Sequence, residues 1–372
     1  MLRLFRFPVV VTVLGIAAAG VIGGPSVAGI VAILAVLEIS LSFDNAVVNA
    51  TVLAKMDERW QRIFLTLGVI IAVFGMRLVF PIVVVTLSSH LSPGKVLDLA
   101  LNHPHEYSLH LTAAHPAIAA FGGIFLMMIF LDFLFEEREI TWLGPIERPL
   151  AKVGKLDQVS VVIGLVFLII ASTTFAKAHA LQVLVSGVAG LATYIGVSSL
   201  SALFEGDGDD DADDAEGADA DDGDVPHIRV PKSLAQAGLF AFLYLEVLDA
   251  SFSFDGVVGA FAITDRIFVI ALGLGIGACY IRALTVYLVR KGTLGDYVHL
   301  EHGAHWAIGS LAVLLFVSIA HKVPEAVTGL IGIGFIGAAL ISSIARNRRN
   351  RDGASSNEAA ELTPLPSATA GL

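Results

Sequence analysis

Two short segments of this sequence place acidic residues in strongly apolar surroundings. The first reads EISLSFDN and begins at Glu38, and the second reads DASFSFDG and begins at Asp249. Neither contains His or Cys, and carboxylate, amide and hydroxyl oxygens suit Mn²⁺, Mg²⁺ or Ca²⁺ better than thiophilic metals. The sequence therefore predicts a site for a hard divalent cation, although protons could neutralise the same acids. The candidate ligands, including one acid a turn before the second segment, are Glu38, Asp44, Asn45, Glu246, Asp249 and Asp255.

The cost of these acids limits where their side chains can point. A charged residue at the centre of a bilayer costs about 2.5–3.5 kcal/mol on insertion scales, so five of them facing lipid would cost more than ~10 kcal/mol. We therefore expect the acids to face the interior of a helix bundle, where water, a cation or a basic partner can compensate them.

Helical geometry adds a constraint on the first segment. Glu38 and Ser42 share one face of a regular helix, whereas Asp44 lies about 240° round from Glu38. Both carboxylates can face one ion only if the helix breaks, and Asn and Gly after Asp tolerate the required backbone. We predict unwinding near Asp44 and near Asp255, with both aspartates facing a shared cavity.

The two segments share one pattern: an acid, any residue, Ser, an apolar residue, Ser, Phe, Asp, then Asn or Gly. Five predicted spans separate them, so the copies run antiparallel, and inverted repeats of this kind place substrate sites near the midplane. A structural alternative is that an arginine in the next span of each half pairs with Asp44 or with Asp255. The supporting residues of the predicted site are Ser42, Ser253, Arg77 and Arg282.

Composition indicates what kind of protein positions these segments. The chain has 372 residues, of which 56% are hydrophobic and only 15% charged, too few charges to cover a soluble domain of this size. Long apolar stretches predict an all-α polytopic membrane protein with a 5+5 inverted internal repeat. If residues 1–24 are a cleaved signal peptide the protein has nine spans, but we favour a retained helix. The ten predicted spans are 7–23, 27–54, 62–88, 116–135, 159–176, 180–203, 234–262, 266–289, 304–321 and 325–345.

The distribution of basic residues predicts the orientation of these spans. With the N-terminus in the cytoplasm, the cytoplasmic segments hold 17 basic residues and the external segments hold 4. This excess follows the positive-inside rule. We therefore expect a multi-pass protein of the cytoplasmic membrane with both termini in the cytoplasm.

An acidic run divides the chain. Residues 205–224 hold 12 of the 34 acidic residues, and like charges mixed with Gly and Ala are typical of a disordered linker. We predict a membrane half with the first acidic motif over 1–204, a cytoplasmic linker over 205–232, a second membrane half over 233–346, and a disordered cytoplasmic tail over 347–372.

Several functional classes find no support in the sequence. The single cysteine excludes a disulfide framework and a Cys-based metal site. The sequence has no catalytic triad, phosphate loop or nucleic-acid-binding surface, so we predict neither an enzyme, nor a permanently bound cofactor, nor a nucleic-acid partner. The expected partners are the lipid bilayer and metal ions.

Histidines give two weaker candidates. The predicted external loop 89–115 carries His90, His103, His105, His110 and His115, whose spacing fits no closed tetrahedral site, so metal gathering competes with ordinary loop histidines. At the opposite face, His299, His302 and His305 share a helical face beside Glu301, where metal sensing or proton relay competes with interfacial packing. Asp132, near the inner end of its span, is a candidate for lining an exit path.

The two acidic segments resemble the paired intramembrane motifs of the TerC family, E…S-x-D-N and D…D-S. EISLSFDN matches the first closely, and DASFSFDG resembles the second, with Gly256 where the family usually has Ser. Within that family the chain looks like a branch of unknown function. The family is associated with tellurium resistance, and members are implicated in manganese export and in metal protection of exported proteins. The resemblance implies that Glu38, Asp44, Asn45, Asp249 and Asp255 are ion ligands.

The residues and the resemblance together favour a membrane transporter that exports divalent cations, with Mn²⁺ as the first expected substrate. Alternating exposure of a site between the second and seventh spans would carry the ion. The alternative is a non-transporting membrane factor for tellurite or metal stress, or for metallation of exported proteins.

Overall fold

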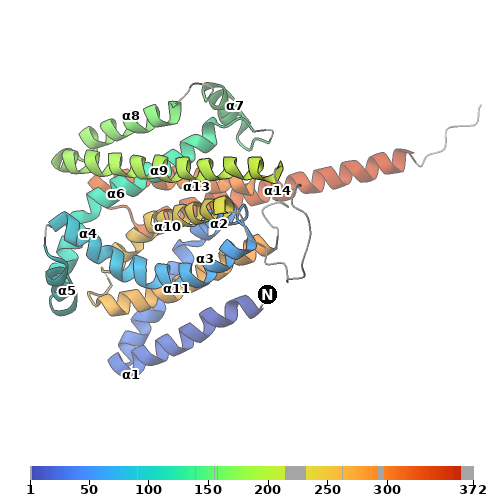
Figure 1. The fold of residues 1–372 in the computed structure, drawn as a ribbon. Helices are drawn as coiled ribbons and strands as arrows, with labels where there is room; N and C mark the ends of the chain where they lie inside the picture. Colours follow the sequence, from blue (N-terminus) through green and yellow to red (C-terminus); the bar gives the residue numbers. More distant parts are fainter. Residues whose placement is uncertain are drawn as a thin grey trace, which may run out of the picture.

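The computed structural model describes residues 2–89, 91–138, 140–154, 156, 158–213, 232–261, 263–291 and 297–361. Side chains are described for the same residues except 2–3, 41, 200–213, 232–237, 254–255, 325 and 350–361. The regular secondary structure of these residues is α-helical, with one π-helical and one 3₁₀ segment, which confirms the all-α prediction. The helices pack side by side into a bundle, and the last helix extends beyond it (Figure 1).

The helices of the N-terminal part carry the first acidic segment and the centre of the bundle. Their bounds are α1 Leu2–Leu41, α2 Phe43–Leu53, α3 Glu58–Ile70, the π-helical segment η1 Ile71–Val79, α4 Phe80–Ser89, α5 Pro93–Asn102, α6 Pro104–Phe135, α7 Gly144–Val153 and α8 Val159–Thr174. The rest are the 3₁₀ turn η2 Lys177–His179, α9 Ala180–Asp213, α10 Lys232–Ala260, α11 Ile267–Arg290, α13 Leu300–Ala320 and α14 Glu325–Glu361.

Seven helical stretches within the described residues are long and apolar enough to cross a membrane. The chain is thus a multi-pass membrane protein by helix length and hydropathy. The count is below the ten predicted spans partly because the first two, 7–23 and 27–54, are counted as one stretch. They correspond to two helices that together make up α1 and meet at non-helical backbone at Gly24 (φ 81°, ψ 178°) before Pro25, and the second continues into α2. In addition, α8, which corresponds to the predicted span 159–176, has only 16 residues, fewer than the ~20 that a spanning helix needs.

Three predicted irregular regions are more helical than expected. The predicted external loop 89–115 forms α5 and the first turns of α6, each of which starts with proline at its N-terminus, where a missing N–H costs nothing. α9 continues into the acidic run as far as Asp213, and residues 214–231 of the predicted linker lie outside the described residues. α14 extends to Glu361, so the predicted disordered tail begins as helix, and residues 362–372 lie outside the described part.

The core forms around α6, which is buried along most of its length. Small residues allow its neighbours to approach closely. A Cβ added at Gly123 would lie 2.7 Å from the Phe316 ring of α13, and one at Gly190 of α9 would lie 2.3 Å from the backbone oxygen of Phe121. These contacts hold α6 between α9 and α13, so the two halves of the chain share one core.

Contacts at the two ends of the bundle agree with the predicted topology. At one end, Glu301 at the start of α13 forms ion pairs with Lys55 after α2 (3.8 Å) and with Arg138 after α6 (3.4 Å). At the other end, Ser318 late in α13 contacts His115 early in α6 (3.4 Å). The segments predicted to be cytoplasmic therefore meet at one end, and α6 and α13 run antiparallel.

Candidate functional site

The helix that carries the first acidic segment breaks at Ser42, two residues before Asp44, near which the sequence predicted unwinding. α1 ends at Leu41, Ser42 adopts a non-helical conformation (φ −101°, ψ 18°), and α2 starts at Phe43. The second predicted break is wrong, because α10 continues through residue 255 and ends only at Ala260. The two segments therefore differ in backbone, and only the first turns its aspartate onto a new helix N-terminus.

Asp44 is a buried carboxylate in the first turn of α2, where the positive end of the helix dipole favours a negative charge. Its side chain is 5% exposed. It packs against Gly332 of α14, where an added Cβ would lie only 2.4 Å from Asp44 Oδ2. Among the described residues, no basic side chain pairs with Asp44.

Glu38 has a basic partner from the next membrane-crossing stretch. Arg77 Nη2 lies 2.5 Å from Glu38 Oε1, and both side chains are buried. Arg77 also donates to the backbone oxygen of Ala72 from within η1, a π-helical segment of the kind often found at functional sites. The predicted alternative that Arg77 pairs with Asp44 is therefore wrong, since Arg77 binds Glu38.

Arg282 holds two acids of the second half. Its guanidinium binds both oxygens of Glu246, at 3.0 and 3.2 Å, and Asp249 Oδ2 at 3.1 Å. Its planar face lies over the Phe64 ring, 3.9 Å from the ring centroid. A fork of donors fixed in this way satisfies carboxylates that would otherwise be very costly to bury. The side chain of Asp255, the predicted alternative partner, lies outside the described residues.

One hydrogen bond joins the two acidic segments. Asn45 Nδ2 donates to Asp249 Oδ1 at 3.0 Å, although the two residues are 204 positions apart. Both side chains are buried. The sequence prediction that the two segments meet inside the bundle is therefore confirmed for this pair.

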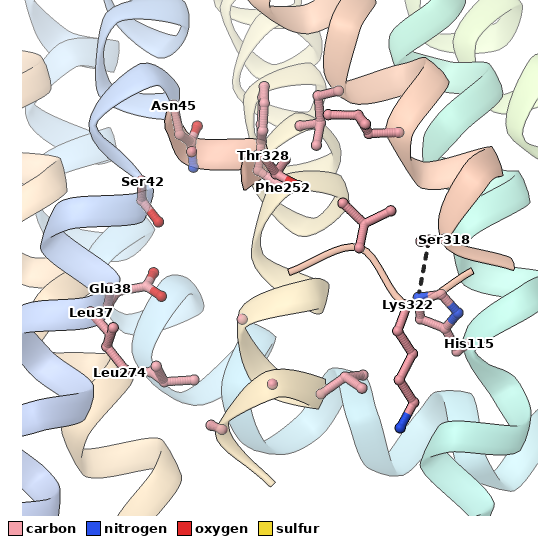
Figure 2. A pocket seen from close by; sticks show the side chains of 18 of the residues that line it. Leu37, Glu38, Ser42, Asn45, His115, Phe252, Leu274, Ser318, Lys322 and Thr328 are labelled. Carbon is pink, nitrogen blue, oxygen red and sulfur yellow. Dashed lines mark hydrogen bonds between the residues drawn. The ribbon is translucent and has the colours of Figure 1, made fainter. Parts of the chain in front are cut away.

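A cavity of about 500 Å³ reaches the first segment. Figure 2 shows Glu38, Ser42 and Asn45 on one wall, with His115 and Lys322 across the space. Asp44 also lines the cavity, but Glu246, Asp249 and Ser253 do not. Of the predicted ligands with described side chains, three therefore face the cavity, and the two acids bound to Arg282 lie outside its walls.

Several buried polar atoms near these acids have no hydrogen-bond partner among the described residues. They are Asn45 Oδ1, Arg77 Nε, Ser253 Oγ, and both polar atoms of the Asn49 side chain. Buried side-chain amides and hydroxyls are normally paired because leaving them unpaired costs free energy. Asn49 was visible in the sequence as a polar residue on the helical face of Asn45, but it was not predicted as a site residue.

The charges of this region do not cancel within the described side chains. Among these side chains, the region holds four buried acids but only two buried arginines, so two negative charges remain if every acid is ionised. The acids are Glu38, Asp44, Glu246 and Asp249, and the arginines are Arg77 and Arg282. No group of three or more His, Cys, Asp or Glu side chains within the described part is arranged to hold a metal ion. An ion here would take one free carboxylate and neutral oxygens rather than a cage of carboxylates.

A second polar cluster, which sequence reasoning missed, surrounds Glu147 at the predicted cytoplasmic end. Its carboxylate accepts hydrogen bonds from the backbone N–H groups of Trp142 and Leu143 and from Trp306 Nε1, and contacts His302 Nδ1 at 3.3 Å. Burial opposes its ionisation, but these donors outweigh burial, so the pKa of Glu147 lies below its ordinary value. The side chain ties α7 to α13.

The other secondary candidates have packing roles in the structure. His305 stacks on Phe133, with ring centroids 3.9 Å apart, and His302 packs edge-on against the same ring. Asp132 is exposed and accepts a hydrogen bond from the Tyr194 hydroxyl, so it does not line the cavity. Of the predicted loop histidines, only His115 lines the cavity, and His90 lies outside the described residues.

Comparison with known proteins gives the family of the chain. No curated protein and no solved structure matches it. One family model matches residues 43–350, which include Asp44, Asn45 and the whole second acidic segment. Because that model covers most of the chain, the protein belongs to the DUF475 family, whose description is a protein of unknown function.

Proposed function

We propose that this protein transports divalent cations across the membrane, with Mn²⁺ as the first expected substrate, through a site built around Asp44. The observation that carries the proposal is Asp44 itself: a buried carboxylate without a basic partner among the described side chains, on the wall of a cavity. A cation in the cavity would supply the missing charge.

The donor set supports a hard cation. Asp44 would provide a carboxylate oxygen, and the unpartnered Asn45 Oδ1 and the Ser42 hydroxyl lie on the same wall. Oxygen donors of this kind bind Mn²⁺, Mg²⁺ or Ca²⁺. Of the two uncompensated negative charges of the described side chains, Asp44 carries one at the cavity, and the other belongs to the Arg282 cluster, which Asn45 joins through Asp249.

The paired acids would have a different role from the free one. Three of the acids are bound to arginines: Glu38, Glu246 and Asp249. They would influence the cation affinity and the conformation of the site rather than coordinate the ion directly. Because Asn45 donates a hydrogen bond to Asp249, a cation bound in the cavity would affect the conformation of both acidic segments. Ten spans, an inverted repeat and alternating exposure of this site complete the proposed transporter. Its proposed direction, export, rests on the resemblance to the TerC family.

The test is Mn²⁺ flux into liposomes that contain purified protein and an enclosed Mn²⁺-sensitive dye. Wild-type protein should carry Mn²⁺, and Asp44→Asn, which keeps shape but removes charge, should lower both Mn²⁺ affinity and flux at least tenfold. Asp265→Asn, at an exposed acid outside the cavity, is the matched control and should leave both unchanged. Normal flux by Asp44→Asn would refute the site, and Mn²⁺ binding without flux in wild type would favour a non-transporting metal factor.

A further inference from the structure

The side chain of Asn49 is buried without any visible compensation. It is 1% exposed, and neither Oδ1 nor Nδ2 finds a hydrogen-bond partner in the part of the chain that the structure describes. Packing alone would be better served by a leucine of similar size, because an unpaired amide lowers the stability of the folded protein. A transient ligand would give this amide a partner.

The position of Asn49 relative to the cavity is set by α2. Asn45 and Asn49 are four residues apart, so they lie on one face of the helix about 6 Å apart along its axis. Asn45 lines the cavity and Asn49 does not. α2 then continues toward Lys55, which pairs with Glu301 at the opposite end of the bundle from His115. Asn49 therefore lies one turn further along α2 than the cavity-lining Asn45, toward the Lys55 end of the bundle.

α10 brings a carboxylate to the same level. Its early residues Gly238 and Phe242 pack against Trp60, which follows α2 closely in sequence at the Lys55 end. α10 therefore runs antiparallel to α2. Since Asn45 is level with Asp249, the residue one turn earlier on α10, Glu246, is level with the turn of α2 that holds Asn49.

We propose that Asn49 forms an inner subsite for the divalent cation, on the far side of the Asn45–Asp249 hydrogen bond from the cavity. This inference rests on the proposed function. The amide oxygen of Asn49 coordinates the partly hydrated ion after it leaves Asp44 and Asn45, and the cluster of Glu246, Asp249 and Arg282, with two acids and one arginine, supplies net negative charge at the same level. Asn45 and Asn49 thus offer the ion two successive amide oxygens along one helix face.

A neutral ligand such as the Asn49 amide oxygen is suited to binding a cation transiently during transport. Conduction and transport require an ion to bind well enough to enter a site and weakly enough to leave it. A carboxylate at position 49, level with Glu246, would hold a divalent cation too firmly, whereas an amide oxygen binds it without a net charge. If instead a buried water merely satisfied Asn49, the residue would have no part in flux.

The experiment compares Asn49→Leu with wild type for thermal stability in detergent, equilibrium Mn²⁺ affinity and Mn²⁺ flux into liposomes. We expect Asn49→Leu to be at least as stable as wild type and to bind Mn²⁺ at the outer site within threefold of the wild-type affinity, while flux falls at least tenfold. The matched control is Thr51→Val, at a buried position two residues further on α2 whose hydroxyl already bonds the backbone of Val48; its flux should stay within twofold of wild type.

Other outcomes are equally decisive. Flux of Asn49→Leu within twofold of wild type would overturn the inner subsite and leave the Asp44 site standing. Absence of both Mn²⁺ binding and flux in wild type would instead refute the proposed function, and the subsite with it. If Asn49→Leu does not fold, the isosteric Asn49→Asp takes its place: tighter Mn²⁺ binding with at least fivefold slower flux supports the subsite, and wild-type values for both contradict it.

Discussion

Asn45 donates a hydrogen bond to Asp249 at 3.0 Å and thereby links the helix break of the first half to the arginine cluster of the second. Asp249 in turn binds Arg282, which also binds Glu246. A change at the cavity wall can therefore reach the buried ion pairs through one amide. This connection makes the region a single unit, and its parts can be tested separately.

Removal of Arg282 should be among the most damaging single changes in the chain. In Arg282→Met, Glu246 and Asp249 become buried acids without a partner, and breaking such a pair typically costs about 3–5 kcal/mol. We expect a large loss of thermal stability in detergent, or loss of monodisperse protein. The double variant Arg282→Met/Glu246→Gln should recover part of this loss. Equal stability of Arg282→Met and wild type would contradict the ion-pair assignment.

Gly332→Ala should impair the proposed cation site without unfolding the bundle. The added methyl group would lie 2.4 Å from Asp44 Oδ2 and 2.9 Å from its Cγ, so the carboxylate must move. We expect Mn²⁺ affinity to fall by roughly tenfold, about 1.4 kcal/mol, measured by titration calorimetry. Gly334→Ala on the same helix is the control, since its added Cβ meets nothing within 4 Å. Equal affinities of the two variants would show that the position of Asp44 is not important.

The Glu147 cluster predicts a pH dependence of stability. The pKa of Glu147 is lowered in the folded protein from its ordinary value of 4.5. A lowered folded-state pKa means that the charged carboxylate stabilises the fold above pH 4.5, and that this contribution is lost as the pH falls through the lowered value. Glu147→Gln should therefore lose about 1–3 kcal/mol at pH 7. Thermal unfolding at pH 7 and near pH 3.5 checks this, because the gap between variant and wild type should narrow at the lower pH; a constant gap would argue against it.

Gly24 should be needed for the kink of α1. Its φ of 81° and ψ of 178° lie in a region that is essentially restricted to glycine, so Gly24→Ala should cost about 1–3 kcal/mol. Gly29→Ala, further along α1 in helical backbone with open space around it, should be neutral or slightly stabilising. Thermal unfolding of the two variants in the same detergent provides the comparison. A stable Gly24→Ala protein would mean that α1 can straighten without loss.

The sequence predicted the positions of the helices better than the partners of the site residues. Apolar length was enough to find most membrane helices and the turn between residues 23 and 27. The angular separation of Glu38 and Asp44 on a regular helix predicted a break near Asp44, and the structure has it at Ser42. The pairing of Arg77 with Glu38 rather than Asp44 depends on how two helices are rotated against each other, and on the π-helical turn around Arg77. No linear pattern contains that information.

Local similarity also misled the prediction for the second segment. DASFSFDG resembles the first segment, yet α10 stays helical through it as far as Ala260. A glycine such as Gly256 permits a break but does not require one. Glu147 was missed for a different reason. It lies on the short helix α7, outside every predicted span, and its burial depends on His302 and Trp306, more than 150 residues later in the chain.

Among the described side chains, the excess of two negative charges over Arg77 and Arg282 would have an energetic consequence for the proposed transporter in a living cell. If the loaded site is neutral, the membrane voltage does little work on the step that moves the ion. An empty site with both charges exposed to the field feels the voltage instead, at roughly 2.3 kcal/mol per elementary charge per 100 mV for a full crossing. An interior-negative potential would then drive the vacant carrier toward the outside, and the return to the cytoplasm would limit turnover unless protons accompany it.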